Sequence, residues 1–189
     1  MKILANDGIS PSGAIALQEA GFEVLTTNVA QEQLANFINS EGIAALVVRS
    51  ATKVPRELIE ACPTLQLIGR GGVGMDNIDV DHAKKKGIHV VNTPAASSTS
   101  VAELVFAHLF CGVRHLYDAN RNMPLEGDQN FKQLKKAYSN GMELKGKTLG
   151  LLGFGKIGQA TAKMAFGLGM DVVFHDPEVK EKTLRLAFF

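Results

Sequence analysis

The stretch that decides the fold is Gly153-Phe154-Gly155-Lys156-Ile157-Gly158. It follows the apolar run Leu149–Leu152, and the acidic residue Asp176 closes the next apolar run. A G-x-G-x-x-G stretch between a strand and a helix, with an acid after the following strand, is the fingerprint of a dinucleotide-binding fold. Without those flanks, a cluster of glycines would more often mark an ordinary turn.

Each position of this motif has a physical task. Gly153 permits the tight turn that leaves the strand, Gly155 lets the backbone approach a pyrophosphate, and Gly158 lets the helix pack close to the sheet. The amides of residues 154–157 then point into a helix N-terminus, where partial positive charge suits an anion. Asp176 would accept hydrogen bonds from the ribose hydroxyls. The motif and Asp176 are therefore the predicted cofactor-binding residues.

The acid also bears on the choice of cofactor. A carboxylate at Asp176 would repel the 2′-phosphate of NADP, and no arginine follows at positions 177 or 178 to receive that phosphate. Lys180 and Lys182 are the basic residues that follow, and they weigh against this choice. The sequence predicts NAD rather than NADP.

Composition and charge narrow the class of protein. Of the 189 residues, 46% are hydrophobic and 21% charged, which is typical of a globular protein with an apolar core. A formal net charge of +1 gives no strong field for nucleic acid or a membrane. Cys62 and Cys111 lack CxxC spacing, and no cluster of metal ligands is found. With no signal peptide or bilayer-spanning stretch, we expect a cytoplasmic protein without nucleic-acid or membrane partners.

Short apolar runs alternate with helical patterns in the first half of the chain. The expected strands are Lys2–Asn6, Phe22–Thr26, Ala44–Arg49, Leu65–Arg70 and Ile88–Asn92. The expected helices are Ser12–Ala20, Gln31–Ser40, Pro55–Ala61 and Val80–Lys86. This alternation predicts an α/β domain, with a parallel sheet and helices on both of its faces.

A polar connector leads into the second half. Ser100 and Glu103 match a capping box, so we expect a long apolar helix from Ser100 to about Leu116. Residues 117–143 are polar and mixed, and we interpret them as a loop region with a short helix near 130–137.

A second sheet opens after this region, with strands at 147–152 and 171–175 and a helix at 156–168 between them. Two-stranded pieces are marginal in water, and these strands are apolar enough to need neighbours on both sides. We therefore expect the chain to be a fragment of a longer protein. The alternative is a short protein whose partner supplies the missing strands.

Seven blocks of sequence point to a known family. They are Val48–Val54, Ile68–Asp79, Val91–Pro94, Ser100–Glu103, Leu144–Gly150, Gly153–Gly158 and His175–Pro177. Together and in this order they resemble the NAD-dependent D-isomer-specific 2-hydroxyacid dehydrogenases, over essentially the whole chain. Within that family, the block from Arg49 to Val54 favours the members that act on 3-phospho-D-glycerate.

The resemblance implies two domains. Residues 1–98 would form a flavodoxin-like substrate domain, and residues 99–189 a linker helix and the beginning of a Rossmann NAD-binding domain. The substrate-binding positions of the family fall on Arg49, Ser50, Gly72, Val73 and Gly74.

The first two of these residues would contact the phosphate or carboxylate side of the substrate, because an arginine fork suits an oxyanion. The amides of the glycine loop would hold the carboxylate, with Val73 also at the nicotinamide end of the cofactor. The alternatives are that Arg49 simply ends a strand in solvent and that the glycines form a plain turn. Asp76 and Asn77 are interpreted as loop-organising groups that act through side chain to backbone bonds.

By the same resemblance, the Arg, Glu and His that carry the chemistry lie beyond residue 189. None of His82, His89, His108, His115 and His175 fits the family's histidine. No catalytic residue is therefore assigned, and we expect the 189-residue chain not to turn over.

The activity expected of the full-length protein is NAD-dependent oxidation of 3-phospho-D-glycerate to 3-phosphohydroxypyruvate in serine biosynthesis. Its expected partners are a small phosphorylated 2-hydroxy acid and a second copy of itself in a homodimer. Two alternatives stay open. One is a non-catalytic NAD-binding or dimerisation module on the same scaffold, and the other is a dehydrogenase for an unphosphorylated 2-hydroxy acid.

Overall fold

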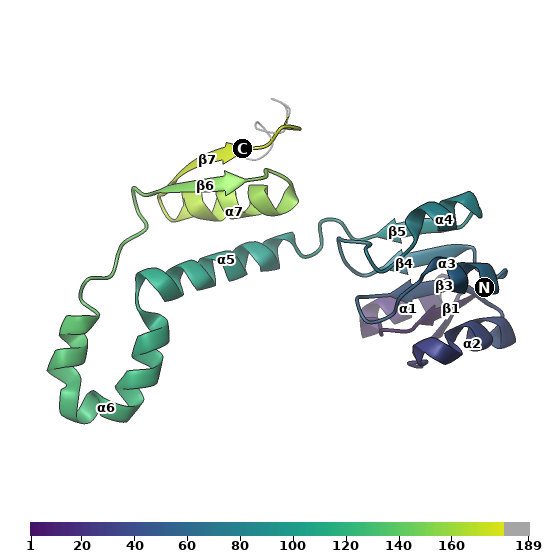
Figure 1. Cartoon of the computed structure of the whole chain (residues 1–189), viewed down its shortest axis with the longest axis horizontal. Helices are drawn as coiled ribbons and strands as arrows, with labels where there is room; N and C mark the ends of the chain where they lie inside the picture. Colours follow the sequence, from purple (N-terminus) through teal and green to yellow (C-terminus); the bar gives the residue numbers. More distant parts are fainter. Residues whose placement is uncertain (180–189) are drawn as a thin grey trace. The chain divides into compact units, whose positions relative to one another are not determined.

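The computed structural model describes residues 1–179, which form two compact units (Figure 1). The first unit is Met1–Ala96, and the second begins at Ser97. Lys180 and Lys182, which bear on the choice of cofactor, lie outside the described residues.

The first unit is built on one parallel sheet. Its strands are β1 (Lys2–Ala5), β2 (Glu23–Leu25), β3 (Ile43–Val48), β4 (Leu67–Arg70) and β5 (His89–Asn92). Their spatial order is β2-β1-β3-β4-β5, and all four pairings are parallel. This is the flavodoxin-like order, which confirms the predicted fold class. The chain changes direction along the sheet between β1 and β3, and this is the topological switch point.

Helices connect these strands. They are α1 (Pro11–Glu19), a 3-10 turn Gln31–Gln33 running into α2 (Leu34–Glu41), α3 (Arg56–Ala61) and α4 (Val80–Lys85). Right-handed crossovers that run in opposite directions along a sheet fall on opposite faces, which places α1 opposite the other three. The core lies under α2, α3 and α4, where Ile38, Leu58 and Ala83 pack against Leu46 and Ile68 of the strands.

The second unit contains a strand–helix–strand piece. Its elements are α5 (Ser98–Val113), α6 (Leu116–Ala137), β6 (Thr148–Leu152), α7 (Lys156–Gly167) and β7 (Asp171–His175). The strands β6 and β7 pair in parallel, as the sequence predicts. Phe106 of α5 and Ala165 of α7 form a small core with Leu144 and Met170.

The start of α5 differs from the predicted start. The helix begins at Ser98, and the side chain of Ser97 at its N-cap makes no capping hydrogen bond. Ser100 therefore lies within the first turn, and the capping box that it was predicted to form with Glu103 is wrong.

The short helix predicted near 130–137 is confirmed, but the loop predicted before it is wrong. Residues Leu116–Ala137 form α6, which passes through Pro124 and is interrupted at Asn130 by non-helical backbone angles. Proline removes one backbone donor but has a helical φ, so a helix can continue across it at a cost. The polar composition was misleading because Lys, Gln, Glu and Arg are also good helix formers. Across residues 1–179, no helix has the length and hydropathy that spanning a bilayer requires.

Candidate functional site

A cleft of about 680 Å³ opens in the first unit at the carboxyl ends of its parallel strands. Its lining includes Asp7, Arg49, Arg70, Gly71, Asn92 and Thr93. These residues follow or end β1, β3, β4 and β5. Ligands of open α/β sheets bind outside the carboxyl ends of the strands at the switch point. Asp7 and Arg49 flank that point, so this cleft is the natural ligand site of the unit.

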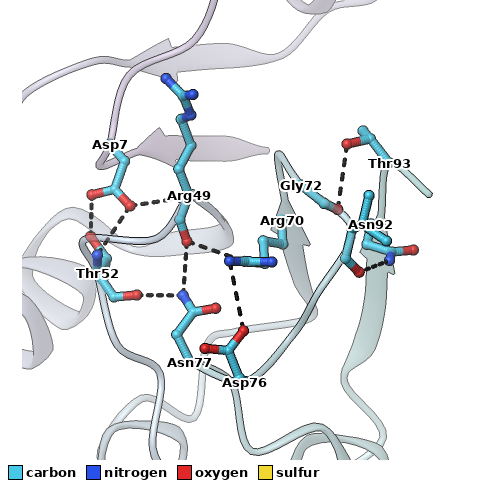
Figure 2. Close-up of polar contacts among 10 residues, drawn as sticks. Asp7, Arg49, Thr52, Arg70, Gly72, Asp76, Asn77, Asn92 and Thr93 are labelled. Atoms are coloured by element: carbon cyan, nitrogen blue, oxygen red, sulfur yellow. Dashed lines mark hydrogen bonds and ion pairs between the residues drawn. The ribbon is translucent and has the colours of Figure 1, made fainter. Parts of the chain in front are cut away.

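Asp7 binds the backbone of the segment that follows β3 (Figure 2). One oxygen of its carboxylate accepts the amide N–H of Arg49 at 2.7 Å and that of Thr52 at 3.0 Å. The other oxygen accepts the hydroxyl of Thr52 at 2.5 Å. Three donors therefore converge on this carboxylate.

These contacts determine the charge state of Asp7. Burial disfavours the ionised carboxylate, but the hydrogen bonds from Thr52 and from the backbone of Arg49 and Ala51 outweigh it. The pKa of Asp7 is lowered below its ordinary value as a result. Asp7 is therefore an anion at neutral pH.

Asn77 binds the backbone carbonyl groups of the same segment. Its side-chain amide donates to the carbonyl of Arg49 at 2.8 Å and to that of Thr52 at 2.6 Å. The prediction that Asn77 organises a loop through side chain to backbone bonds is confirmed. Asp76 behaves differently, because its carboxylate lies 3.8 Å from the Arg70 guanidinium and pairs with that side chain instead.

The glycine loop after β4 is tied down on both sides. The amide of Thr93 donates to the carbonyl of Gly72 at 3.1 Å, and the Asn92 side chain donates to the carbonyl of Val73 at 2.7 Å (Figure 2). The amide of Gly72 donates to the backbone carbonyl of Arg70. Over residues 1–179, the amides of Val73 and Gly74 have no acceptor within the chain, so both are available to a ligand.

Two of these glycines also make room for an arginine. A Cβ atom at Gly72 would lie 3.2 Å from Nη1 of Arg70, and one at Gly74 would lie 3.3 Å from the same atom. Both distances are tighter than ordinary contacts, so a side chain at either position would require the Arg70 guanidinium to shift by a few tenths of an ångström. The Arg70 side chain is only 12% exposed.

The predicted substrate residues are not all placed alike. Arg49 is exposed and lines the cleft, whereas Ser50, Gly72, Val73 and Gly74 lie outside its lining. Gly71 of the same loop, which was not among the predicted residues, does line the cleft.

Asp7, Thr52, Arg70 and Asn92 belong to this site but were not predicted from the sequence. Asp7, Arg70 and Asn92 share one signal, since each ends or follows an apolar run. The carboxyl ends of parallel strands meet at one edge of the sheet, and polar residues there were the sign to look for.

The glycine motif of the second unit has the geometry that its sequence predicts. Gly153 has a φ of +94°, a conformation that side-chain-bearing residues rarely adopt. A Cβ atom at Gly158 would collide with the backbone carbonyl oxygen of Gly153, so helix α7 can begin here only with glycine. Gly155 has open space where its Cβ would be.

Phe154 contributes to this loop in two ways. Its ring is buried and stacks on Phe174, with ring centroids 4.0 Å apart. Its amide donates to the carboxylate of Asp176 at 2.6 Å. The ring therefore anchors the loop to Phe174 of β7, while the amide fixes the loop to Asp176 just after that strand.

Both carboxylate oxygens of Asp176 accept hydrogen bonds from backbone amides. The second oxygen accepts the amide of Glu178 at 2.9 Å. The hydrogen bonds from Phe154 and then Glu178 lower the pKa of Asp176 below its ordinary value, so it is ionised at neutral pH. A carboxylate has about four lone-pair sites, which leaves capacity for ribose hydroxyls.

These features fit a dinucleotide. In the described part of the chain, the amides of Lys156 and Ile157 donate to no acceptor, as expected at the first turn of a helix. They stand beside the open space over Gly155. Backbone donors, a helix N-terminus and an acid at the neighbouring strand end suit a pyrophosphate and its ribose.

The buried Cys62 is poorly suited to act as a nucleophile. Burial raises the pKa of the Cys62 thiol, which disfavours the thiolate needed for nucleophilic chemistry. No three His, Cys, Asp or Glu side chains among residues 1–179 are grouped in a way that could hold a metal ion.

Comparison with known proteins agrees with this geometry. The family model "D-isomer specific 2-hydroxyacid dehydrogenase, catalytic domain" matches residues 3–183. Hydroxypyruvate reductase of Thermotoga maritima is 40% identical over 188 residues, which are 99% of this chain and 59% of that protein. D-3-phosphoglycerate dehydrogenase of Methanocaldococcus jannaschii is 41% identical over 182 residues, 96% of this chain and 33% of that protein.

A solved structure with bound cofactor is also similar. The NAD⁺-bound 3-phosphoglycerate dehydrogenase of Entamoeba histolytica matches with a TM-score of 0.72 at 28% identity, over 97% of this chain and 56% of that one. The chain thus spans between a third and three fifths of the length of these relatives. The family consists of NAD(P)-dependent oxidoreductases. On its motifs, its fold and this match, the chain belongs to the D-isomer-specific 2-hydroxyacid dehydrogenase family.

Proposed function

We propose that this chain belongs to an NAD-dependent dehydrogenase that oxidises 3-phospho-D-glycerate to 3-phosphohydroxypyruvate, in the synthesis of serine. Residues 1–98 would bind the substrate, and residues 99–189 would begin the NAD-binding domain. The site residues proposed for the substrate are Arg49, Ser50, Gly72, Val73 and Gly74, as the sequence predicts, together with Arg70.

The observation that carries this proposal is a pair of arginines in one cleft. Arg49 and Arg70 both line the cleft at the carboxyl edge of the sheet. The available amides of Val73 and Gly74 lie on the loop that follows Arg70. A phosphorylated hydroxy acid carries two oxyanions, a carboxylate and a phosphate, and guanidinium groups and backbone amides are suitable partners for both.

The cofactor would be held by residues 153–158 and by Asp176. NAD, when bound, supplies the acceptor for the hydride that leaves the substrate carbon. The chain's own groups would bind and orient it, with the amides of Lys156 and Ile157 toward the pyrophosphate. The ionised Asp176 would accept from the ribose hydroxyls and disfavour a 2′-phosphate, which supports NAD over NADP.

Calorimetric titration of the 189-residue chain tests the substrate. We expect 3-phospho-D-glycerate to bind more tightly than D-glycerate. Arg49→Gln and Arg70→Gln should each weaken the phosphorylated ligand roughly 10- to 100-fold, the range for hydrogen bonds to charged groups. Arg56→Gln is the matched control, because Arg56 is exposed on α3 and pairs with Glu60 outside the cleft. Equal affinities for the two ligands would contradict the proposed substrate.

A turnover assay tests where the chemistry resides. With NAD and 3-phospho-D-glycerate, we expect no NADH formation from the 189-residue chain. A measurable rate would contradict the assignment of the catalytic Arg, Glu and His to a segment beyond residue 189.

A second candidate is a dehydrogenase for an unphosphorylated hydroxy acid. The 40% identity to a hydroxypyruvate reductase over nearly the whole chain favours it. The same titration separates the two candidates, since preference for D-glycerate or hydroxypyruvate over the phosphorylated ligand would support this one.

The assembly proposed for the protein is a homodimer. The support is that α6 carries several large apolar side chains exposed to water, among them Leu125 at 78% and Phe131 at 52%. Contact with a second copy would remove such side chains from water. Light scattering measures the mass directly, and a monomer at micromolar concentration would contradict this part of the proposal.

A further inference from the structure

We propose that Asp7 is a positioning residue for the anionic substrate, holding the Arg49–Thr52 segment so that the Arg49 guanidinium is presented to the cleft. This inference rests on the proposed function, because it assumes that an anion binds in this cleft. It adds a residue that contacts no substrate itself. An acid in an anion-binding cleft is otherwise unexpected, because it would repel the ligand.

The first step is that the segment is held from two sides by distant parts of the chain. Asp7 follows β1 and accepts the amides of Arg49 and Thr52 at 2.7 and 3.0 Å. Asn77 precedes α4 and donates to the carbonyls of the same two residues at 2.8 and 2.6 Å. With the N–H and the C=O of both residues fixed by side chains, the backbone from which the Arg49 side chain projects has one conformation.

The second step is that Asp7 is itself anchored through the core. Asn6, its neighbour, is buried and donates to the Thr52 hydroxyl at 2.8 Å, while that hydroxyl donates to Asp7. Asn6 also accepts the amide of Val29 at 2.8 Å and donates to its carbonyl at 3.1 Å. A hydrogen-bonded network that reaches into the core in this way rigidifies the segment, and removing one member leaves its partners unpaired.

The third step concerns which groups the Asp7 carboxylate faces. Within residues 1–179 no ion pair joins Asp7 to the Arg49 guanidinium. In Figure 2 the Arg49 side chain extends away from Asp7, whose oxygens face the backbone of the segment. The negative charge is therefore matched by backbone amides and a hydroxyl. The Arg49 guanidinium keeps its own charge for a ligand.

A positioning role and a purely electrostatic role of Asp7 predict opposite effects of Asp7→Asn on the affinity for an anion. If Asp7 acted only as a negative charge near the cleft, Asp7→Asn would tighten the binding of an anion. If Asp7 positions the segment, Asp7→Asn keeps one acceptor oxygen and replaces the other with an amide donor, which then faces either the two N–H groups or the Thr52 hydroxyl that now donate to Asp7. The segment would then move, and anion binding would weaken.

The test is titration of the 189-residue chain and its variants with 3-phospho-D-glycerate. We expect Asp7→Asn to weaken binding at least 10-fold and Asp7→Glu, which keeps the carboxylate, to weaken it less. Asp76→Asn is the matched control, since Asp76 is an exposed acid beside Arg70 and binds no backbone of the segment. It should leave the affinity unchanged or raise it. Unchanged or tighter binding by Asp7→Asn would overturn the proposal.

A second measurement needs neither a variant nor a ligand. In the unmodified chain, amide hydrogen exchange at Arg49 and Thr52 should be slow compared with that at the exposed Ser50 between them. If Arg49 and Thr52 exchange as fast as Ser50, the carboxylate does not hold the segment and the proposal is wrong. This keeps the inference testable even if Asp7→Asn fails to fold.

Failure of the proposed substrate can be told apart from failure of this inference. If the unmodified chain binds inorganic phosphate but not 3-phospho-D-glycerate, the proposed substrate is wrong. The Asp7 and Asp76 variants are then compared with phosphate as the probe, with the same expected signs.

Discussion

The two units of this chain complete their sheets to different degrees. In the first unit, Leu46 lies on β3 between two paired neighbours and is fully buried. In the second unit, Leu152 ends β6 of a two-stranded sheet and is 93% exposed. Both are leucines on parallel strands. The comparison shows that a strand's apolar residues need the next strand and a covering helix before they contribute a core.

The two ligand sites are held together differently as a consequence. The cleft of the first unit depends on side chains that reach across the fold, such as Asp7 and Asn77 on the segment after β3. The glycine motif of the second unit depends on local backbone geometry, with Gly153 donating to His175 and Phe154 to Asp176. A local motif can therefore form within a sheet of two strands, whereas a site at a switch point needs a complete sheet.

The largest expected effect comes from the two leucines. Leu46→Ala should destabilise the first unit by about 2–5 kcal/mol, the cost of removing a fully buried leucine side chain. Leu152→Ala should change stability by less than about 0.5 kcal/mol, because the side chain is already in water. Residue-specific hydrogen exchange measures each unit separately, since one melting temperature is not well defined for two units. A large effect of Leu152→Ala would show that a second chain covers that face.

Thr52→Val tests how far the first site depends on its network. The hydroxyl of Thr52 accepts from Asn6 and donates to Asp7, and its loss leaves buried partners unsatisfied at a cost of about 1–3 kcal/mol. Ser50→Ala is the matched control, with an exposed hydroxyl whose loss should matter by less than about 0.5 kcal/mol. Urea unfolding followed by first-unit amide signals gives both values. Equal effects would mean that the network adds no stability.

Gly158→Ala tests the local motif in the second unit. The added Cβ meets the carbonyl of Gly153, so we expect a loss of about 1–3 kcal/mol in that unit and loss of NAD binding. Gly167→Ala lies on the same helix with open space around it and should stabilise by about 0.4–1 kcal/mol. Exchange of the α7 amides reports both changes. Unimpaired NAD binding by Gly158→Ala would contradict the close packing at this turn.

The smallest effect is expected on acidification. The pKa of Asp7 and that of Asp176 are both lowered in the folded chain, by hydrogen bonds that outweigh burial. Their contribution to stability is present above the unfolded pKa of about 3.9 and is lost as pH falls through the folded pKa. Asp7→Asn should abolish the loss of stability at low pH in the first unit only, and Asp176→Asn should abolish it in the second unit only. Carboxyl carbon shifts in an NMR titration give the two pKa values, and values at or above 3.9 would contradict both sets of bonds.

Most elements of this fold could be predicted from local pattern. The strands of the first unit and the strand–helix–strand of the second lie within two residues of their predicted positions, because apolar runs and glycine turns are local signals. The part of α6 before Asn130 was missed for a local reason as well. Its polar sequence suits both a loop and an exposed helix, and Pro124 favoured the loop.

The glycine motif of the second unit and the cleft of the first unit differ in how much the sequence alone could predict. The turn at Gly153 and the packing at Gly158 follow from one continuous stretch of chain. Asp7, Arg49 and Arg70 end or follow three strands far apart in sequence, and only their meeting makes a site. No periodicity or spacing relates such residues. The sequence signal that was missed is weaker, namely a polar residue at the end of each apolar run.

The amino-acid sequence by itself determined the α/β class, the glycine turn and the acid at the end of β7, because each is fixed by neighbouring residues. Only the tertiary structure decided that Asp7 binds the backbone beside Arg49, that Arg70 passes over Gly72 and Gly74, and that Leu152 is exposed. The physical reason is that hydrogen bonds and burial across a sheet depend on strand order. In this chain that order is decided by which apolar faces pack together, and sequence spacing does not record it.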